Sequence, residues 1–220
     1  MQKIIVFDFD NTLVKSLDYW YKVTDKLAFF DVNQKPNKNF PKMHKHLGNK
    51  DIAKKFIEVT NVNLTIQQVK DIWAKHMEYF YTNKVKLIKG AVNFLNYLKS
   101  KNYTLRLASA TDYSLLVKSL KHFDLLKFFD YIFTEDTLSY SKREVEFFNT
   151  LLNKLNTKPQ NVLFFEDSFT SVKNATNLGI NTVCLLNKYN LPYKKQLKQC
   201  SKLLIKNYNN KKVYNLITED

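Results

Sequence analysis

The sequence predicts a protein of the α/β class, in which a parallel sheet carries helices on both faces and an all-helical segment is inserted near the start. From residue 89 onward, short apolar runs alternate with amphipathic stretches, an order typical of parallel strands joined by crossover helices. Residues 16–88 show helical spacing of apolar residues and contain no comparable strand run. A chain of 220 residues is long enough for a core domain with a smaller inserted domain.

The elements follow in order from the N-terminus. Residues 3–7 form an apolar run typical of a buried strand. Helical spacing recurs at 17–30 and 65–81, and the polar stretch 33–41 between them reads as a loop. The rest of the chain is predicted as helix 89–102, strand 103–109, helix 112–123, strand 131–134, helix 143–156, strand 161–168, helix 169–179 and strand 180–186, with segments 202–206 and 211–217 completing the alternation. We therefore assign residues 1–15 and 89–220 to a core domain and residues 16–88 to a helical domain.

The formal net charge of +15 raises the possibility of a nucleic-acid partner, but the composition argues against it. Only two of the 35 basic residues are arginines, Arg106 and Arg143, and arginine is the usual side chain for bidentate recognition of bases and phosphates. The segment 188–212 has eight lysines and no acidic residue, which fits a solvated basic face. A nucleic-acid-binding or end-processing protein remains an alternative, and its mark would be binding that weakens steeply with salt.

The compartment is also predicted from composition. Cys184 and Cys200 are the only cysteines, which favours two reduced thiols over a disulfide framework. No apolar run approaches the ~18 residues of a membrane span, and the N-terminus lacks the pattern of a secretory signal. We therefore expect a cytoplasmic protein without a membrane partner, as a monomer or weak homodimer.

Polar residues stand at the ends of several predicted strands. Asp8 and Asp10 follow the first strand, Ser109 ends the second, and Glu166 and Asp167 end a later one. Because ligand sites of open parallel sheets lie beyond the carboxyl ends of the strands, these side chains should converge at one edge. Four carboxylates there suit a hard cation, above all Mg²⁺, and a hydroxyl with a lysine at the same edge suits a phosphate group.

The order of these motifs resembles that of the haloacid dehalogenase-like (HAD) superfamily of hydrolases, over the whole chain. The family's first motif, DxDxT after a buried strand, stands here as residues 8–12, and its second motif is the strand-ending Ser109. The third is the lysine before a helix, Lys142, and the fourth is the acidic strand end at residues 166–167. The family usually writes the third motif Lys-Pro-x-Pro, whereas this chain has Arg143 and Val145 in the proline places, although Phe148 remains. Since the prolines preset the loop and do no chemistry, we retain Lys142.

The resemblance implies a Rossmann-like core and a role for each motif residue. Asp8 would be the nucleophile that forms an aspartyl-phosphate, and Asp10 would protonate the leaving group and then activate water. Lys142 would neutralise both Asp8 and the phosphate. The resemblance implies that Mg²⁺ is held by Asp8, Asp10, Glu166 and Asp167, and that the phosphate is held by Ser109, Lys142 and the backbone N–H groups of Phe9, Asn11, Ala110 and Thr111.

The second acid, Asp10, separates the reaction classes within this family. Relatives that remove halide lack it, because a halide needs no proton, so the resemblance implies a phosphate ester as substrate. We therefore predict a Mg²⁺-dependent phosphatase acting on a small phosphorylated metabolite such as a phosphosugar, nucleotide or phosphoglycolate. A phosphomutase of the β-phosphoglucomutase kind, which uses the same four motifs, is the nearest alternative.

Residues 16–88 occupy the position of the family's helical cap. In relatives with such a cap, the loop around a cap glycine often faces the active site. Here that loop contains Gly48, Asn49 and Lys50, which become candidate substrate contacts. The competing interpretation is an ordinary turn between helices.

Overall fold

The computed structural model describes residues 4–44 and 47–218, and its chain divides into two compact units. The first unit comprises Met1–Lys15 and Leu87–Asp220, and the second comprises Ser16–Lys86.

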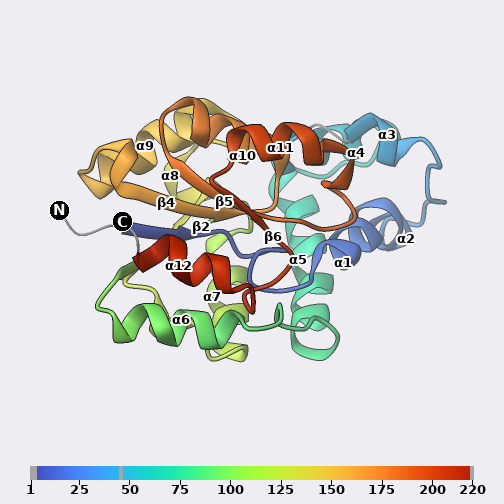
Figure 1. Cartoon of the computed structure of the whole chain (residues 1–220). Coiled ribbons are helices and arrows are strands. Elements are labelled where there is room, and N and C mark those ends of the chain that lie inside the picture. Colours follow the sequence, from blue (N-terminus) through green and yellow to red (C-terminus); the bar gives the residue numbers. More distant parts are fainter. Residues whose placement is uncertain (1–3, 45–46, 219–220) are drawn as a thin grey trace. The chain divides into compact units, whose positions relative to one another are not determined.

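The first unit contains a six-stranded, fully parallel sheet with the order β3-β2-β1-β4-β5-β6 (Figure 1). Its strands are β1 Ile4–Phe7, β2 Thr104–Ser109, β3 Tyr131–Thr134, β4 Val162–Glu166, β5 Asn181–Leu185 and β6 Leu203–Ile205. Phe7 is in register with Leu107 of β2 and with Phe165 of β4. The residue after Phe7 therefore emerges between the ends of two neighbouring strands. The predicted α/β class with a parallel sheet is confirmed.

Seven α-helices are described in this unit. They are α6 Ala91–Ser100, α7 Tyr113–His122, α8 Glu135–Leu138, α9 Val145–Leu155, α10 Phe169–Asn177, α11 Lys194–Cys200 and α12 Lys211–Thr218, with 3₁₀ turns η2 Leu126–Phe128, η3 Pro159–Asn161 and η4 Leu191–Tyr193. The sequence did not predict the short helices α8 and α11, and α11 lies within the basic segment.

Apolar side chains that point alternately to the two faces of the sheet bury both of them. Val6 and Phe164 pack into one apolar cluster with Phe148 of α9. Their neighbours Phe7 and Phe165 stack at 4.6 Å between ring centroids on the other face, where Phe94 of α6 and Tyr208 join them. Figure 1 accordingly shows α9 and α10 on one side of the sheet and α6 and α12 on the other. Because successive side chains of a strand point to opposite faces, the continuous apolar runs of β1 and β4 serve two cores.

The described part of the second unit contains helices joined by loops and no strand. Its elements are α1 Leu17–Lys22, the π-helical turn η1 Val23–Leu27, α2 Ala28–Asp31, α3 Phe40–His44, α4 Asn49–Thr60 and α5 Ile66–Asn83. Its core includes a cluster of edge-to-face aromatic rings from Phe29, Phe40 and Phe56. Helix α3 begins at Phe40, inside the stretch predicted as a loop, because this ring is buried in that cluster.

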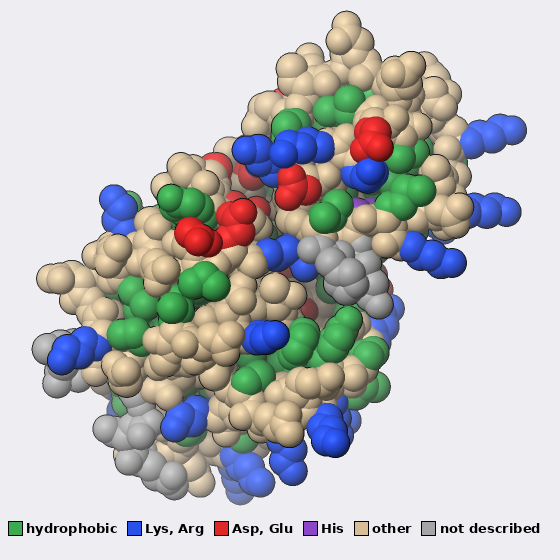
Figure 2. Space-filling model, turned by 90° about the horizontal axis from the view of Figure 1, so that it is seen from above, with side chains coloured by type: hydrophobic (Ala, Val, Ile, Leu, Met, Phe, Trp, Pro, Cys, Tyr) green, Lys and Arg blue, Asp and Glu red, His purple; other side chains and the backbone are tan. Residues whose placement is uncertain are grey.

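None of the described helices is long and apolar enough to cross a membrane. Figure 2 shows lysine and arginine side chains mostly scattered singly over the face in view, with no continuous basic stripe.

Candidate active site

Asp8 is placed by the end of β1 at the carboxyl edge of the sheet. Its backbone N–H donates to the Phe165 carbonyl of β4 at 2.9 Å, so the residue is still held by the sheet. The chain then turns sharply, because the Phe9 carbonyl accepts hydrogen bonds from the N–H groups of Thr12, Leu13 and Val14. The Asp8 carboxylate is buried at this turn.

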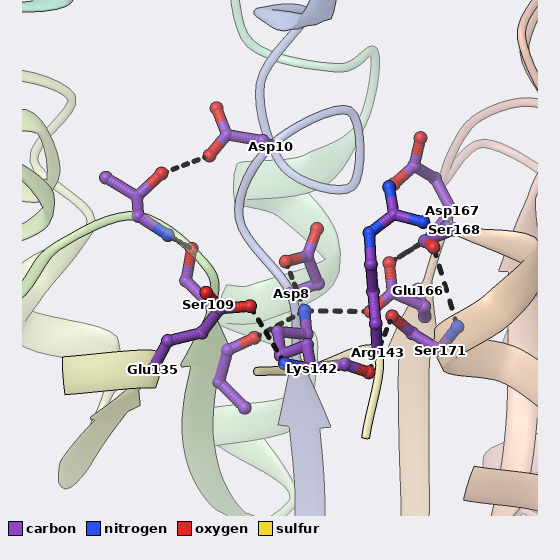
Figure 3. Close-up of polar contacts among 12 residues, drawn as sticks. Asp8, Asp10, Ser109, Glu135, Lys142, Arg143, Glu166, Asp167, Ser168 and Ser171 are labelled. Atoms are coloured by element: carbon purple, nitrogen blue, oxygen red, sulfur yellow. Dashed lines mark hydrogen bonds and ion pairs between the residues drawn. The ribbon is translucent and has the colours of Figure 1, made fainter. Parts of the chain in front are cut away.

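Lys142 reaches the same point from the loop that precedes α9 (Figure 3). Its Nζ lies 2.6 Å from Asp8 Oδ1, 2.8 Å from Glu166 Oε2 and 2.9 Å from the Ala108 carbonyl oxygen. Desolvation acts to lower the pKa of Lys142, but the charges of Asp8 and Glu166 outweigh it and raise that pKa above its ordinary value. The lysine is therefore a buried ammonium group between two carboxylates.

Asp8, Glu166 and Asp167 form a buried acidic cluster, with one carboxylate oxygen from each lying within 4.8 Å of the others. Burial, followed by the charge of Glu166, raises the pKa of Asp8 to about 7, although Lys142 opposes this. Burial and the charges of Glu166 and Asp8 likewise raise the pKa of Asp167. Such a cluster carries more negative charge than one lysine neutralises, and all its donors are oxygens. It fits a hard divalent cation such as Mg²⁺.

Two of these acids are fixed by neighbouring donors. Glu166 Oε1 accepts from the backbone N–H groups of Asp167 at 2.8 Å and Ser168 at 2.9 Å. Asp167 Oδ2 accepts from Asn187 Nδ2 at 2.7 Å, and its carbonyl accepts from Asn190 Nδ2 at the same distance. The carboxylates are thus oriented before any cation binds.

Thr111 links Ser109 and Asp10 through two hydrogen bonds. Ser109 Oγ, at the end of β2, accepts from the Thr111 backbone N–H at 3.1 Å. The Thr111 hydroxyl in turn donates to Asp10 Oδ2 at 2.7 Å (Figure 3). Helix α7 begins two residues later, with Asp112 at its N-cap position. A phosphate group beside Ser109 would therefore also lie near a helix N-terminus.

The structure brings together the side chains of six residues predicted for the site, which are Asp8, Asp10, Ser109, Lys142, Glu166 and Asp167. Phe9 and Ala110 lie in the same two strand-end loops. Asn11 differs from the prediction, because its backbone N–H donates to the Val14 carbonyl at 2.7 Å and is used within the turn. Its φ of +55° belongs to that turn, and asparagine tolerates this region better than most residues.

The three candidate substrate contacts lie in the helical unit. Gly48 is the N-cap residue of α4, with Asn49 and Lys50 as its first two helical residues. His44, at the end of α3, is buried and bonded to Asp25 at 2.6 Å, whereas His46 lies outside the described residues.

Sequence reasoning missed four residues that orient this site: the hydroxyl of Thr111 and the side chains of Glu135, Asn187 and Asn190. Asn187 directly follows the apolar run of β5 and Asn190 comes three residues later, so the strand-end pattern that identified the acids contained a signal for the first of them. Glu135 directly follows β3, and the same pattern applies to it.

The fold and this edge define a class: an α/β protein whose parallel sheet ends in a buried acidic cluster with a lysine. A family model described as haloacid dehalogenase-like hydrolase matches residues 5–185, and the chain belongs to that family. The resemblance noted from the motifs is confirmed, and the chain is accordingly an enzyme of a hydrolase family.

Individual relatives share only a small part of their sequence with this chain. A phosphorylated carbohydrates phosphatase from Thermotoga maritima is 27% identical over 127 residues, which are 58% of this chain and 59% of that protein. The matched part is therefore less than two thirds of that relative's length. Two solved structures share the fold. CbbY from Rhodobacter sphaeroides, in complex with phosphate, has a TM-score of 0.78 at 16% identity over 94% of this chain and 95% of its own. YfnB from Bacillus subtilis, bound to magnesium, has a TM-score of 0.68 at 16% identity over 99% of each chain.

Proposed function

We propose that the protein is a Mg²⁺-dependent phosphatase that hydrolyses a small phosphomonoester through an aspartyl-phosphate on Asp8. The observation that carries this proposal is the position of Asp10, a second acid held at the same edge by Thr111. Two acids at one site provide both a nucleophile and a proton donor for an oxygen leaving group. The T. maritima relative, named as a phosphatase of phosphorylated carbohydrates, supports a phosphosugar as the first substrate to test.

In the proposed reaction, an oxygen of Asp8 attacks phosphorus and the bond to the ester oxygen breaks. Asp10 gives its proton to that oxygen and then takes a proton from water, which attacks the phosphorus of the aspartyl-phosphate. Inorganic phosphate leaves and Asp8 is regenerated. The Lys142 ammonium, 2.6 Å from Asp8 Oδ1, stabilises negative charge in both steps. Ser109 and the N–H groups of Phe9 and Ala110 are the proposed phosphate donors.

The cation would be held by Asp8, Glu166, Asp167 and the Asp10 carbonyl oxygen. When bound, it supplies positive charge that offsets repulsion between the Asp8 carboxylate and a phosphate dianion. YfnB, solved with magnesium on the same fold, supports this choice of ion. The helical unit is proposed to act as the cap that recognises the leaving group.

Phosphate release from phosphosugars, nucleotides and phosphoglycolate, measured with Mg²⁺, tests this proposal. We expect release that is abolished by EDTA and reduced several orders of magnitude in Asp8→Asn, which keeps the shape but removes the attacking charge. Full activity in excess EDTA, or near-normal turnover of Asp8→Asn, would contradict it. Glucose 6-phosphate formed from a glucose 1-phosphate isomer, in place of free phosphate, would instead support the phosphomutase alternative.

A further inference from the structure

The loop that carries Lys142, residues 139–144, contains no proline. Its backbone is therefore free of the restriction that a proline ring imposes on φ. Lys142 nevertheless has to deliver its ammonium group to within 2.6 Å of Asp8 Oδ1 from a long, rotamer-rich side chain. Something else must therefore fix the loop.

One carboxylate oxygen holds the loop on the side of α8. Glu135 Oε1 accepts from the backbone N–H of Lys142 at 2.8 Å (Figure 3). The same oxygen accepts from the hydroxyl of Ser141 at 2.9 Å. Glu135 is the first residue of α8 and directly follows β3, so its backbone is anchored to the sheet. A hydrogen bond to a charged acceptor such as this carboxylate is stronger than one between neutral groups.

The opposite side of the loop is held by α10, the helix that follows the acidic strand end. The Ser171 hydroxyl donates to the Lys142 carbonyl at 3.4 Å, and Asn174 Nδ2 donates to the Arg143 carbonyl at 2.8 Å. Among these contacts, only the hydrogen bond to Glu135 is made by the backbone N–H of Lys142.

We propose that Glu135 is a positioning residue for Lys142, and that its carboxylate fixes by hydrogen bonding a loop that no proline restricts. The inference rests on the proposed function, since it assigns Lys142 a part in phosphate chemistry. Without Glu135, the loop loses its fixed acceptor and the buried ammonium group no longer has one position between Asp8 and Glu166.

A proline at position 145 could compensate for the loss of Glu135. Val145 is the first residue of α9, a position that proline tolerates because its N–H has no partner inside the helix. The preceding residue, Glu144, has φ −102° and ψ 146°, the extended backbone that a residue before proline prefers. Val145→Pro should therefore restore part of the covalent restriction without distorting the loop.

Four single variants and one double variant test the proposal by kcat/KM for the best substrate. Glu135→Ala should lose about tenfold or more, whereas Glu135→Gln, which keeps a carbonyl acceptor, should stay within about threefold of the parent protein. Glu146→Ala, an exposed glutamate in the same segment, is the matched control and should be unchanged. Val145→Pro alone should also be unchanged, and Glu135→Ala/Val145→Pro should recover most of the loss.

Affinity for inorganic phosphate with Mg²⁺, measured by calorimetry, gives a second readout that needs no turnover. It should weaken in Glu135→Ala and recover in the double variant. Equal kcat/KM and equal phosphate affinity in Glu135→Ala and Glu146→Ala would overturn the proposal, as would a folded double variant without recovery. A parent protein that binds phosphate but releases none from any ester would contradict the proposed phosphatase, while the phosphate affinities would still decide the role of Glu135.

Discussion

Asp10 has to donate and then accept a proton in the proposed reaction, so its carboxyl group must stay in place while its charge changes. The 2.7 Å hydrogen bond from the Thr111 hydroxyl is suited to this, because a hydroxyl can rotate to donate to a carboxylate or to accept from a carboxylic acid. Thr111→Val keeps the shape and removes the hydroxyl. We expect kcat/KM to fall about tenfold, or about 1.4 kcal/mol, with Thr111→Ser close to the parent protein. Equal losses in both variants would assign Thr111 to packing.

A second residue-scale effect concerns stability and lies away from the site. Asp130 bonds to Arg106 at 2.8 Å, Lys99 at 3.2 Å and the Leu105 N–H at 3.3 Å. Desolvation acts to raise the pKa of Asp130, but these partners outweigh it and lower the pKa below its ordinary value of 3.8. A carboxyl group with a lowered pKa in the folded state stabilises the protein above the unfolded-state pKa and loses that effect as the pH falls through the folded-state pKa.

Asp130→Asn should therefore destabilise the protein near neutral pH by at most about 1 kcal/mol, because the group is partly exposed. The difference in the free energy of unfolding should shrink as the pH falls below about 4. Urea unfolding of both proteins across this range measures it. A difference that grows toward acid pH would contradict the assigned sign.

At the scale of elements, the start of α6 depends on one glycine. Gly90 is the N-cap residue with φ +81°, and a Cβ there would lie 2.3 Å from Asn209 Oδ1 and 3.1 Å from the Tyr208 carbonyl carbon. The crowding partners belong to the segment in which the Tyr208 hydroxyl donates to the Thr12 carbonyl, inside the turn after Asp8. The added methyl group of Gly90→Ala would therefore crowd Tyr208 and Asn209, and this segment supports the turn after Asp8.

We expect Gly90→Ala to cost about 2–4 kcal/mol, combining an unfavourable φ with overpacking. Gly179→Ala is the matched control, because its φ of +86° is similar but its nearest added contacts are at 3.4 Å and 3.6 Å. It should cost only about 1 kcal/mol. Urea denaturation gives both values. Equal costs would show that φ alone decides, and that the contact with Asn209 relaxes freely.

The length and burial of an element decide how well the sequence predicts it. The strands were predictable because a strand buried on both faces is an apolar run, as in β1 and β4. The segment 211–217, predicted only to complete the alternation, forms α12, and the four-residue helix α8 is too short for a periodic pattern. The strand-end acids were predictable because strand ends meet at one edge. The bonds of Glu135 and Thr111 were not, because they join residues through the folded loops and no local spacing encodes them.

At the scale of the whole molecule, composition still supports predictions that geometry leaves untested. The positive side chains behind the net charge of +15 are almost all lysines. The basic segment 188–212 includes α11 and the loops on either side of that helix. The cytoplasmic location, the reduced cysteines and the monomer or weak homodimer stay predictions.

Division of labour between the two units gives the last prediction. In the proposed function the first unit handles the phosphoryl group, which every phosphomonoester shares, so discrimination among substrates would come from elsewhere. Lys50 is an exposed lysine in the first turn of α4, in the helical unit. If this unit recognises the leaving group, Lys50→Ala should lower kcat/KM for the best substrate about tenfold, or about 1.4 kcal/mol.

The same variant should hydrolyse p-nitrophenyl phosphate almost normally, because that ester lacks the natural leaving group. Lys55→Ala, on the same helix and paired with Glu58 at 2.6 Å, is the matched control and should behave like the parent protein on both esters. Equal losses on both esters in Lys50→Ala would assign the residue to folding or to closure. An unchanged value on both would leave the start of α4 as an ordinary helix beginning, and substrate recognition would then depend on other residues of the helical unit.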